Sequence, residues 1–155
     1  MGRPYTVGRA LVRGTLTVGI LDILDAFIFF GLRGVKPVSI LQSIASGVLG
    51  RAAYQGGTST AALGLALHFV IALGVVTVYL IATRIVPALN RRPVIYGALY
   101  GIAVYVVMNF VILPMSHGAL GSGPTPLVVR ANGILIHMLG VGLPAALVAA
   151  RAAQR

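Results

Sequence analysis

Apolar residues gather in four long stretches, which glycine, proline and basic residues separate from one another. A helix needs about 20 predominantly apolar residues to cross the hydrocarbon core of a bilayer. Each of the four stretches reaches or approaches that length. The pattern therefore predicts four membrane-spanning helices, at about residues 14–32, 61–83, 93–115 and 126–150.

A shorter segment at about residues 38–54 has a different pattern. Apolar residues recur at helical spacing on one side, and serine and glutamine occupy the other side. The segment is too short and too polar to span a bilayer, so we expect an amphipathic helix that lies in the membrane interface or is partly re-entrant. The predicted fold class is an all-α membrane protein: a four-transmembrane-helix bundle with one extra helix between the first two spans. Residues 1–155 form a single integral-membrane domain.

The composition agrees with this prediction. Hydrophobic residues make up 58% of the chain and charged residues 9%, whereas a typical soluble domain has about 25% charged residues. The lipid bilayer is therefore the first expected partner. We assign the net charge of +10 to loops that face anionic headgroups. We do not expect nucleic acid as a partner, because no basic run is interleaved with aromatic residues. The chain has no cysteine, which excludes disulfides, thiolate metal sites and cysteine nucleophiles.

The distribution of basic residues predicts the orientation. Cytoplasmic segments of membrane proteins carry an excess of lysine and arginine. If the N-terminus is cytoplasmic, eight of the twelve basic residues lie on the inner side, and the outer side holds Arg33, Lys36, Arg51 and Arg130. We therefore expect a multi-pass protein with both termini in the cytoplasm. The prevalence of arginine over lysine is typical of a GC-rich genome and favours the bacterial inner membrane.

Asp22 and Asp25 are the only acidic residues of the chain, and both lie inside the first predicted span. An aspartate at the centre of a membrane helix costs roughly 2.5–3.5 kcal/mol on insertion scales. Three residues apart on a helix, the two side chains lie on the same side. Charged groups at this depth usually face the interior of a bundle, so we expect both to point at neighbouring helices.

Other polar residues lie at a similar depth in the remaining spans. At about 1.5 Å of rise per residue, they fall between the midplane and the outer interface. Because they come from all four helices, we predict one polar cluster made of Asp22, Asp25, His68, Asn109, Arg130 and His137.

Three functional interpretations fit this cluster. Carboxylate and imidazole groups serve proton relays and proton- or cation-linked transport. The same groups are ligands for Zn, Mn or Fe, with Asp22, Asp25, His68 and His137 as the candidates. His68 and His137 could also be axial ligands of a haem or another tetrapyrrole. The sequence identifies no cofactor, and our first expectation is that none is bound. Transport or relay of protons or small cations is the favoured interpretation.

The competing interpretation is structural. Each aspartate could be neutral and hydrogen-bonded to a threonine, asparagine or tyrosine, or one of them could form an internal ion pair with Arg130. A lone histidine in a membrane helix commonly forms hydrogen bonds between helices. No Ser–His–Asp arrangement can be argued, so enzymatic chemistry is the least supported class. A non-catalytic accessory subunit of a larger membrane complex, or a homo-oligomer, is a further alternative, with Gly97-x-x-x-Gly101 as the expected contact.

Three segments carry a resemblance to a known group of proteins: LHFVIALGVVTVYLIATRIVPAL, YGALYGIAVYVVMNFVILPMS and NGILIHMLGVGLP. They contain His68, Asn109 with Pro114, and His137. The chain resembles small uncharacterised bacterial inner-membrane proteins of the YagU-like type. The resemblance extends over about two thirds of the chain and is carried by these three segments. The resemblance implies a four-helix inner-membrane protein without an assigned reaction.

Overall fold

The computed structural model describes residues 6–117 and 125–154, and this part of the chain is helical without any strand. Four helices are long and apolar enough to cross a membrane. This confirms the predicted all-helical fold and its four apolar helices of spanning length. In chain order the four are α1 (Val7–Gly31), α3 (Gly57–Ile85), the third at Pro93–Met115, and the fourth at Leu127–Ala153.

The first two long helices extend beyond the predicted spans. α1 begins at Val7 because the Thr6 side chain accepts a hydrogen bond from the backbone N–H of Arg9 (3.3 Å) and so caps the helix. Hydropathy placed this start at residue 14, since it marks the apolar part of a helix and overlooks a basic first turn. α3 begins at Gly57 without a side-chain cap. Here Thr60 hydrogen-bonds backward, from its hydroxyl to the Ala53 carbonyl (2.6 Å).

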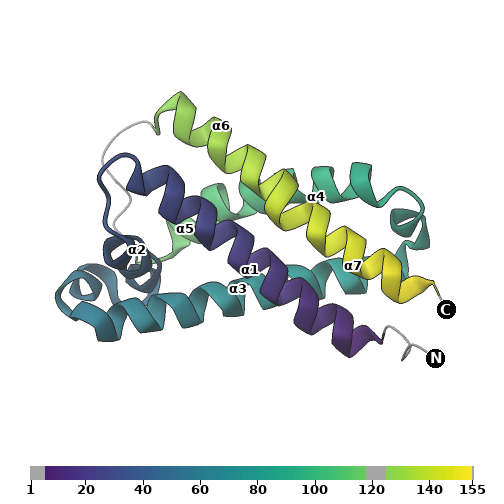
Figure 1. Cartoon of the computed structure of the whole chain (residues 1–155), viewed down its shortest axis with the longest axis horizontal. Coiled ribbons are helices and arrows are strands. Elements are labelled where there is room, and N and C mark those ends of the chain that lie inside the picture. Colours follow the sequence, from purple (N-terminus) through teal and green to yellow (C-terminus); the bar gives the residue numbers. More distant parts are fainter. Residues whose placement is uncertain (1–5, 118–124, 155) are drawn as a thin grey trace.

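The segment between the first two long helices folds as α2 (Pro37–Leu49), followed by a 3₁₀ helix at Gly50–Gln55. The single predicted helix at 38–54 is thus divided. Gly50 ends α2 with a φ of +59°, a conformation that favours glycine. α2 lies at the end of the molecule opposite the N- and C-termini (Figure 1).

The third and fourth helices each contain a wide π-helical turn directly before a Leu–Pro pair. The third consists of α4 (Pro93–Val107), a π turn at Met108–Ile112 and α5 (Leu113–Met115). In the fourth, α6 (Leu127–Ile136) leads into a π turn at His137–Gly142 and then α7 (Leu143–Ala153). Proline has no N–H and its ring clashes with the carbonyl four residues earlier. Widening the preceding turn relieves that clash, and the leucine before each proline bonds five residues back.

Glycines bring the third and fourth helices into backbone contact. A methyl group on Gly101 would overlap the His137 carbonyl, and one on Gly142 would overlap the Gly97 carbonyl. From the sequence, Gly97-x-x-x-Gly101 is the expected contact with a partner; in the structure this motif packs closely against the fourth helix of the same chain. The two glycines are buried against the fourth helix, so this face is not available to an accessory partner.

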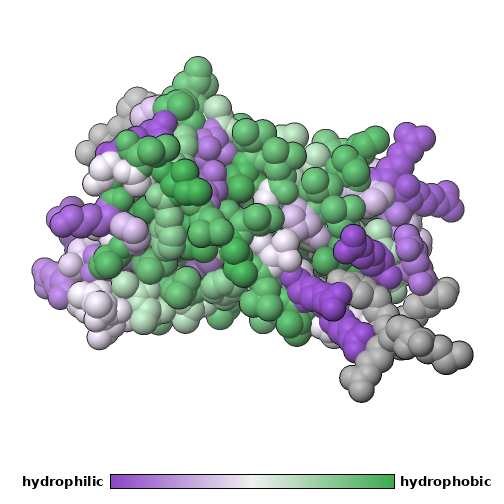
Figure 2. Space-filling view, viewed as in Figure 1, coloured by the Kyte–Doolittle hydropathy of each residue, from purple (hydrophilic) through white to green (hydrophobic). Residues whose placement is uncertain are grey.

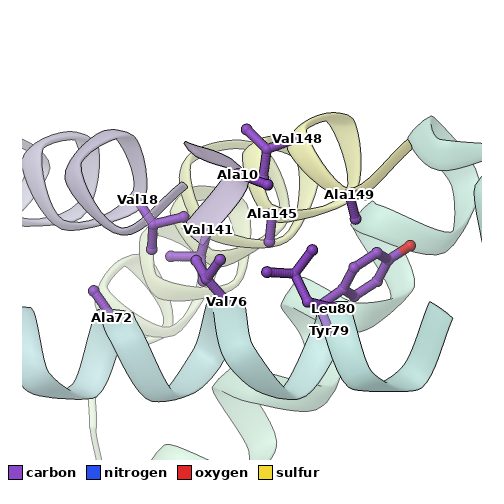
Figure 3. Close-up of a cluster of buried hydrophobic side chains, with 11 residues drawn as sticks. Ala10, Val18, Ala72, Val76, Tyr79, Leu80, Val141, Ala145, Val148 and Ala149 are labelled. Carbon is purple, nitrogen blue, oxygen red and sulfur yellow. The ribbon is translucent and has the colours of Figure 1, made fainter. Parts of the chain in front are cut away.

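An apolar core fills the half of the molecule that contains the termini. Side chains from α1, α3 and the fourth helix point toward one another there (Figure 3), with Val76 and Tyr79 of α3 the largest that are fully buried. α1 begins and α7 ends at this end, where α3 also joins α4 (Figure 1). Hydrophilic surface gathers at both ends of the molecule, with a largely hydrophobic band between them (Figure 2).

Candidate functional site

A cavity of about 400 Å³ lies beyond the core, on the side of α2. Val18, Ala72 and Val141 belong both to the apolar core and to the cavity wall, so the core closes the cavity on the side of the termini. All four long helices and α2 contribute to the lining. Its side chains with hydrogen-bonding groups are Asp22, Asp25, Ser43, His68, Asn109, Ser116, Asn132 and His137.

Asp25 is held by a neighbouring helix. Its Oδ2 accepts a hydrogen bond from Nδ2 of Asn132 on α6 at 2.8 Å. The bond satisfies part of the acceptor capacity of the carboxyl group and fixes its direction. Asp25 is thus partnered by an amide rather than by the cation that the ion-pair hypothesis proposed.

Asp22 occupies the centre of the polar group. It is half-buried, lines the cavity and lies close enough to His68, His137 and Asp25 to interact with each electrostatically. Within the described part of the chain, no group donates a hydrogen bond to its carboxyl oxygens. Asp22 is therefore the acidic group whose carboxyl oxygens are available to bind a ligand or a proton.

His68 is 8% exposed and bonds across to α1. Its Nε2 lies 2.8 Å from the Gly19 carbonyl oxygen. A carbonyl only accepts, so Nε2 carries the hydrogen, and in the neutral ring Nδ1 is an acceptor. Gly19 permits this approach because it has no side chain: a methyl group there would overlap the ring of Phe69.

His137 has the opposite arrangement. Its Nδ1 lies 2.8 Å from the Gly133 carbonyl oxygen, one turn earlier in the same helix. Nδ1 therefore carries the hydrogen, and Nε2 is the acceptor of the neutral ring. Tyr105 packs edge-on against the imidazole, with 5.5 Å between ring centroids. His137 also begins the π turn of the fourth helix.

The remaining two members of the predicted cluster differ in position. Asn109 lines the cavity from the π turn of the third helix, and its Nδ2 donates to the Tyr105 carbonyl oxygen (2.9 Å). Arg130 is exposed and outside the lining. Its long side chain, near the start of α6, can extend away from the interior, as arginines near helix ends commonly do. The structure thus brings five of the six predicted residues to one cavity.

Asn132 and the α2 lining were not part of the predicted cluster. Asn132 is five residues before His137, a spacing that does not repeat on one face of a regular helix. The signal for it was its depth, which matches that of the other polar residues. Ser43 belongs to the polar side of the amphipathic segment that the sequence predicts, but nothing in that pattern indicates that α2 covers a cavity.

The arrangement does not favour the metal and haem hypotheses. Residues 6–117 and 125–154 contain no group of three or more His, Asp or Glu side chains that could hold a metal ion. A haem held by two histidines would usually take Nε2 of each, and Nε2 of His68 is bonded to the Gly19 carbonyl. Asp22, Asp25, His68 and His137 therefore lie near one cavity without forming a coordination shell.

Comparison with protein-family models, with curated proteins and with solved structures finds no match to this chain. These comparisons do not bear on the resemblance to YagU-like proteins, which stays a prediction. The function of this chain is therefore inferred from the cavity itself.

Proposed function

We propose that this chain is a polytopic protein of the bacterial inner membrane that binds and passes protons or small cations through the cavity at Asp22. The single observation that carries the proposal is the position of Asp22. It lies in a cavity beside two histidines and a second carboxyl group, with no hydrogen-bond donor from the described residues. Ionisable groups within membrane spans usually mark ion or proton pathways.

The proposed architecture is a four-helix bundle in which α2 lies in the outer membrane interface, over the cavity. Support comes from the position of α2 at the end away from the termini (Figure 1) and from the two hydrophilic ends of the molecule (Figure 2). The excess of basic residues at the end with the termini favours a cytoplasmic location for both.

The chemistry follows from the two histidines. Each has one ring nitrogen that donates to a carbonyl and one that accepts in the neutral form. Protonation of the accepting nitrogen makes the ring a cation next to Asp22, so a proton can be exchanged between the imidazoles and the carboxylate. Asp25, held by Asn132, adds negative charge to the same site.

Flux through liposomes tests this function. We expect the wild-type protein to dissipate an imposed pH or cation gradient, measured with an enclosed fluorescent indicator. Asp22→Asn should abolish this flux, because the amide cannot ionise, and Asp25→Asn should also abolish it by removing the second charge. Arg130→Gln is the matched control: it removes a charge outside the cavity and should leave the flux unchanged. Folded wild-type protein without any flux would contradict the proposal.

A further inference from the structure

We propose that the cavity binds an organic ammonium ion, a protonated amine with an apolar body, whose charged nitrogen lies beside Asp22. This inference rests on the proposed cation-linked function and names its substrate class. Three features of the cavity lead to it: its size, its charge and the division between its polar and apolar walls.

The volume fits a small molecule rather than a bare ion. Pockets for small organic ligands typically have roughly 300–1,000 Å³, and this cavity has about 400 Å³. A monatomic cation would leave most of that space without contacts. It would also lack a coordination shell, since the described residues offer no metal-holding group of three His, Asp or Glu side chains.

The charge of the lining selects a cation. Both acids of the chain, Asp22 and Asp25, line the cavity, and no lysine or arginine in residues 6–117 and 125–154 does so. The basic side chains of the described residues thus lie elsewhere on the molecule. An anionic ligand would meet two carboxyl groups without a basic partner, whereas a cation would neutralise part of an expensive buried charge.

Most of the remaining wall is aliphatic or aromatic. Phe30 presents an aromatic ring, a group that attracts cations through its π face. The other apolar contributions come from α1, α2, α3 and both later helices, and include Ile23, Ile44, Ile71, Val75, Val104 and Ile136. This apolar part of the wall offers a hydrated inorganic ion no hydrogen-bond partners, but it stabilises a hydrocarbon body.

The hydrogen bonds of the two aspartates indicate that Asp22 is the one that binds the ammonium group. Asp25 already accepts from Asn132, whereas no described residue donates to Asp22. A primary ammonium has three N–H donors, like the side chain of lysine. Asp22 supplies an ionised acceptor for it. The accepting nitrogens of neutral His68 and His137 are further acceptors in the same lining.

Calorimetric titration of the detergent-purified protein at neutral pH provides the test. The probes are cyclohexylamine and benzylamine, which are cationic at this pH, and their neutral counterparts cyclohexanol and benzyl alcohol. We expect saturable binding of the amines and at least about tenfold weaker binding of the alcohols, a difference of about 1.4 kcal/mol. Equal binding of amines and alcohols would overturn the proposal, because the cavity would then select only for shape and apolarity.

Variants locate the charge that the amine meets. Asp22→Asn should weaken amine binding by about tenfold or more and leave alcohol binding unchanged. Arg130→Gln should change neither. If Asp22→Asn does not fold, the amine and alcohol comparison in the wild-type protein still decides the proposal. Amine binding that survives in folded Asp22→Asn would contradict it.

The outcomes separate this inference from the proposed function. Proton or inorganic cation flux that depends on Asp22, without amine binding, would support the function and overturn the ammonium assignment. Amine binding that depends on Asp22, in a protein that passes no proton, inorganic cation or amine, would support the assignment and overturn the transport function.

Discussion

Gly19 positions His68 through two properties that only glycine combines. Its carbonyl oxygen accepts the hydrogen bond from His68 Nε2 at 2.8 Å. Its missing side chain leaves room for the ring of Phe69, the next residue of α3. A buried backbone carbonyl in a helix and a buried imidazole can meet in this way only where α1 and α3 approach closely.

Replacement of Gly19 by alanine should therefore disturb the site and the fold together. The added methyl group overlaps the Phe69 ring, and such overpacking typically costs about 1–3 kcal/mol. We expect a lower free energy of unfolding, measured by denaturant titration in mixed micelles. Gly74→Ala on α3 is the matched control, because nothing lies within 4 Å of its added methyl group. An unchanged stability in Gly19→Ala would contradict the close packing of α1 and α3.

At the residue scale, the sequence predicted that the aspartates and histidines lie inside the molecule. It did not predict which residues form hydrogen bonds with them. The energetic cost of a carboxyl group in the membrane requires that Asp22 and Asp25 turn inward, and both line the cavity. The same cost does not require Arg130 to turn inward, because its long side chain can reach the membrane interface. Asn132 became visible as a partner only in the structure, because a contact between α1 and α6 is not encoded in the spacing of either helix.

At the scale of elements, α2 is attached to α3 by polar and close-packed contacts. The buried side chain of Gln42 donates from Nε2 to the Gly57 carbonyl oxygen at 3.1 Å. Further along α3, a methyl group on Gly64 would overlap the Leu41 carbonyl, so the two backbones are in direct contact. These contacts hold α2 over the cavity, whose wall includes Ile40 and Ser43.

Gln42→Leu should loosen this attachment without unfolding the chain. The loss of a hydrogen bond of this kind typically costs about 0.5–1.5 kcal/mol. We expect faster amide hydrogen exchange in the segment 50–60, measured by mass spectrometry, with little change in α1. The same substitution at exposed Gln55 serves as the control and should leave exchange in that segment as it is in the wild type. Equal exchange in both variants would mean that Gln42 does not hold α2.

The helices themselves were predictable because their apolar length is set by the membrane. The irregularities within these helices were only partly predictable. A proline inside a helix disturbs its regular hydrogen bonding, and Pro114 and Pro144 lie in the third and fourth helices. Hydropathy, however, does not reveal an added residue in a turn. The division of the segment 38–54 at Gly50 likewise depends on a backbone conformation, which the alternation of apolar and polar residues does not report.

At the scale of the whole molecule, the two ends have different roles. The end with the termini is filled by alanine, valine and tyrosine from three helices (Figure 3), whereas the end with α2 contains the cavity. If the proposed orientation holds, the cavity lies toward the outer side of the membrane and the core separates it from the cytoplasm. Passage through the molecule then requires a rearrangement of the core.

The absence of cysteine makes this orientation easy to measure, because a single introduced cysteine is the only thiol in the chain. Lys36→Cys, at the end with α2, should react with a membrane-impermeant maleimide applied to intact spheroplasts. Gln154→Cys, at the end with the termini, should react only after the membrane is opened. The expectation follows from the excess of basic residues at the end with the termini. The reverse labelling pattern would invert the topology.

The π turn at His137–Gly142 has a consequence for how this chain tolerates changes in length. A π turn holds one residue more than an α turn, and each residue of an α-helix rotates its successor by about 100°. Deletion of one residue from this turn, such as exposed Leu139, would restore a regular helix instead of breaking it. Because the wide turn accommodates the extra residue locally, α6 and α7 would both keep their orientation after the deletion. The α7 alanines would stay in the core, and Asn132 would still face Asp25. The wide turn therefore confines one added residue to a single turn of the helix, and the same face of α6 looks into the cavity with or without that residue.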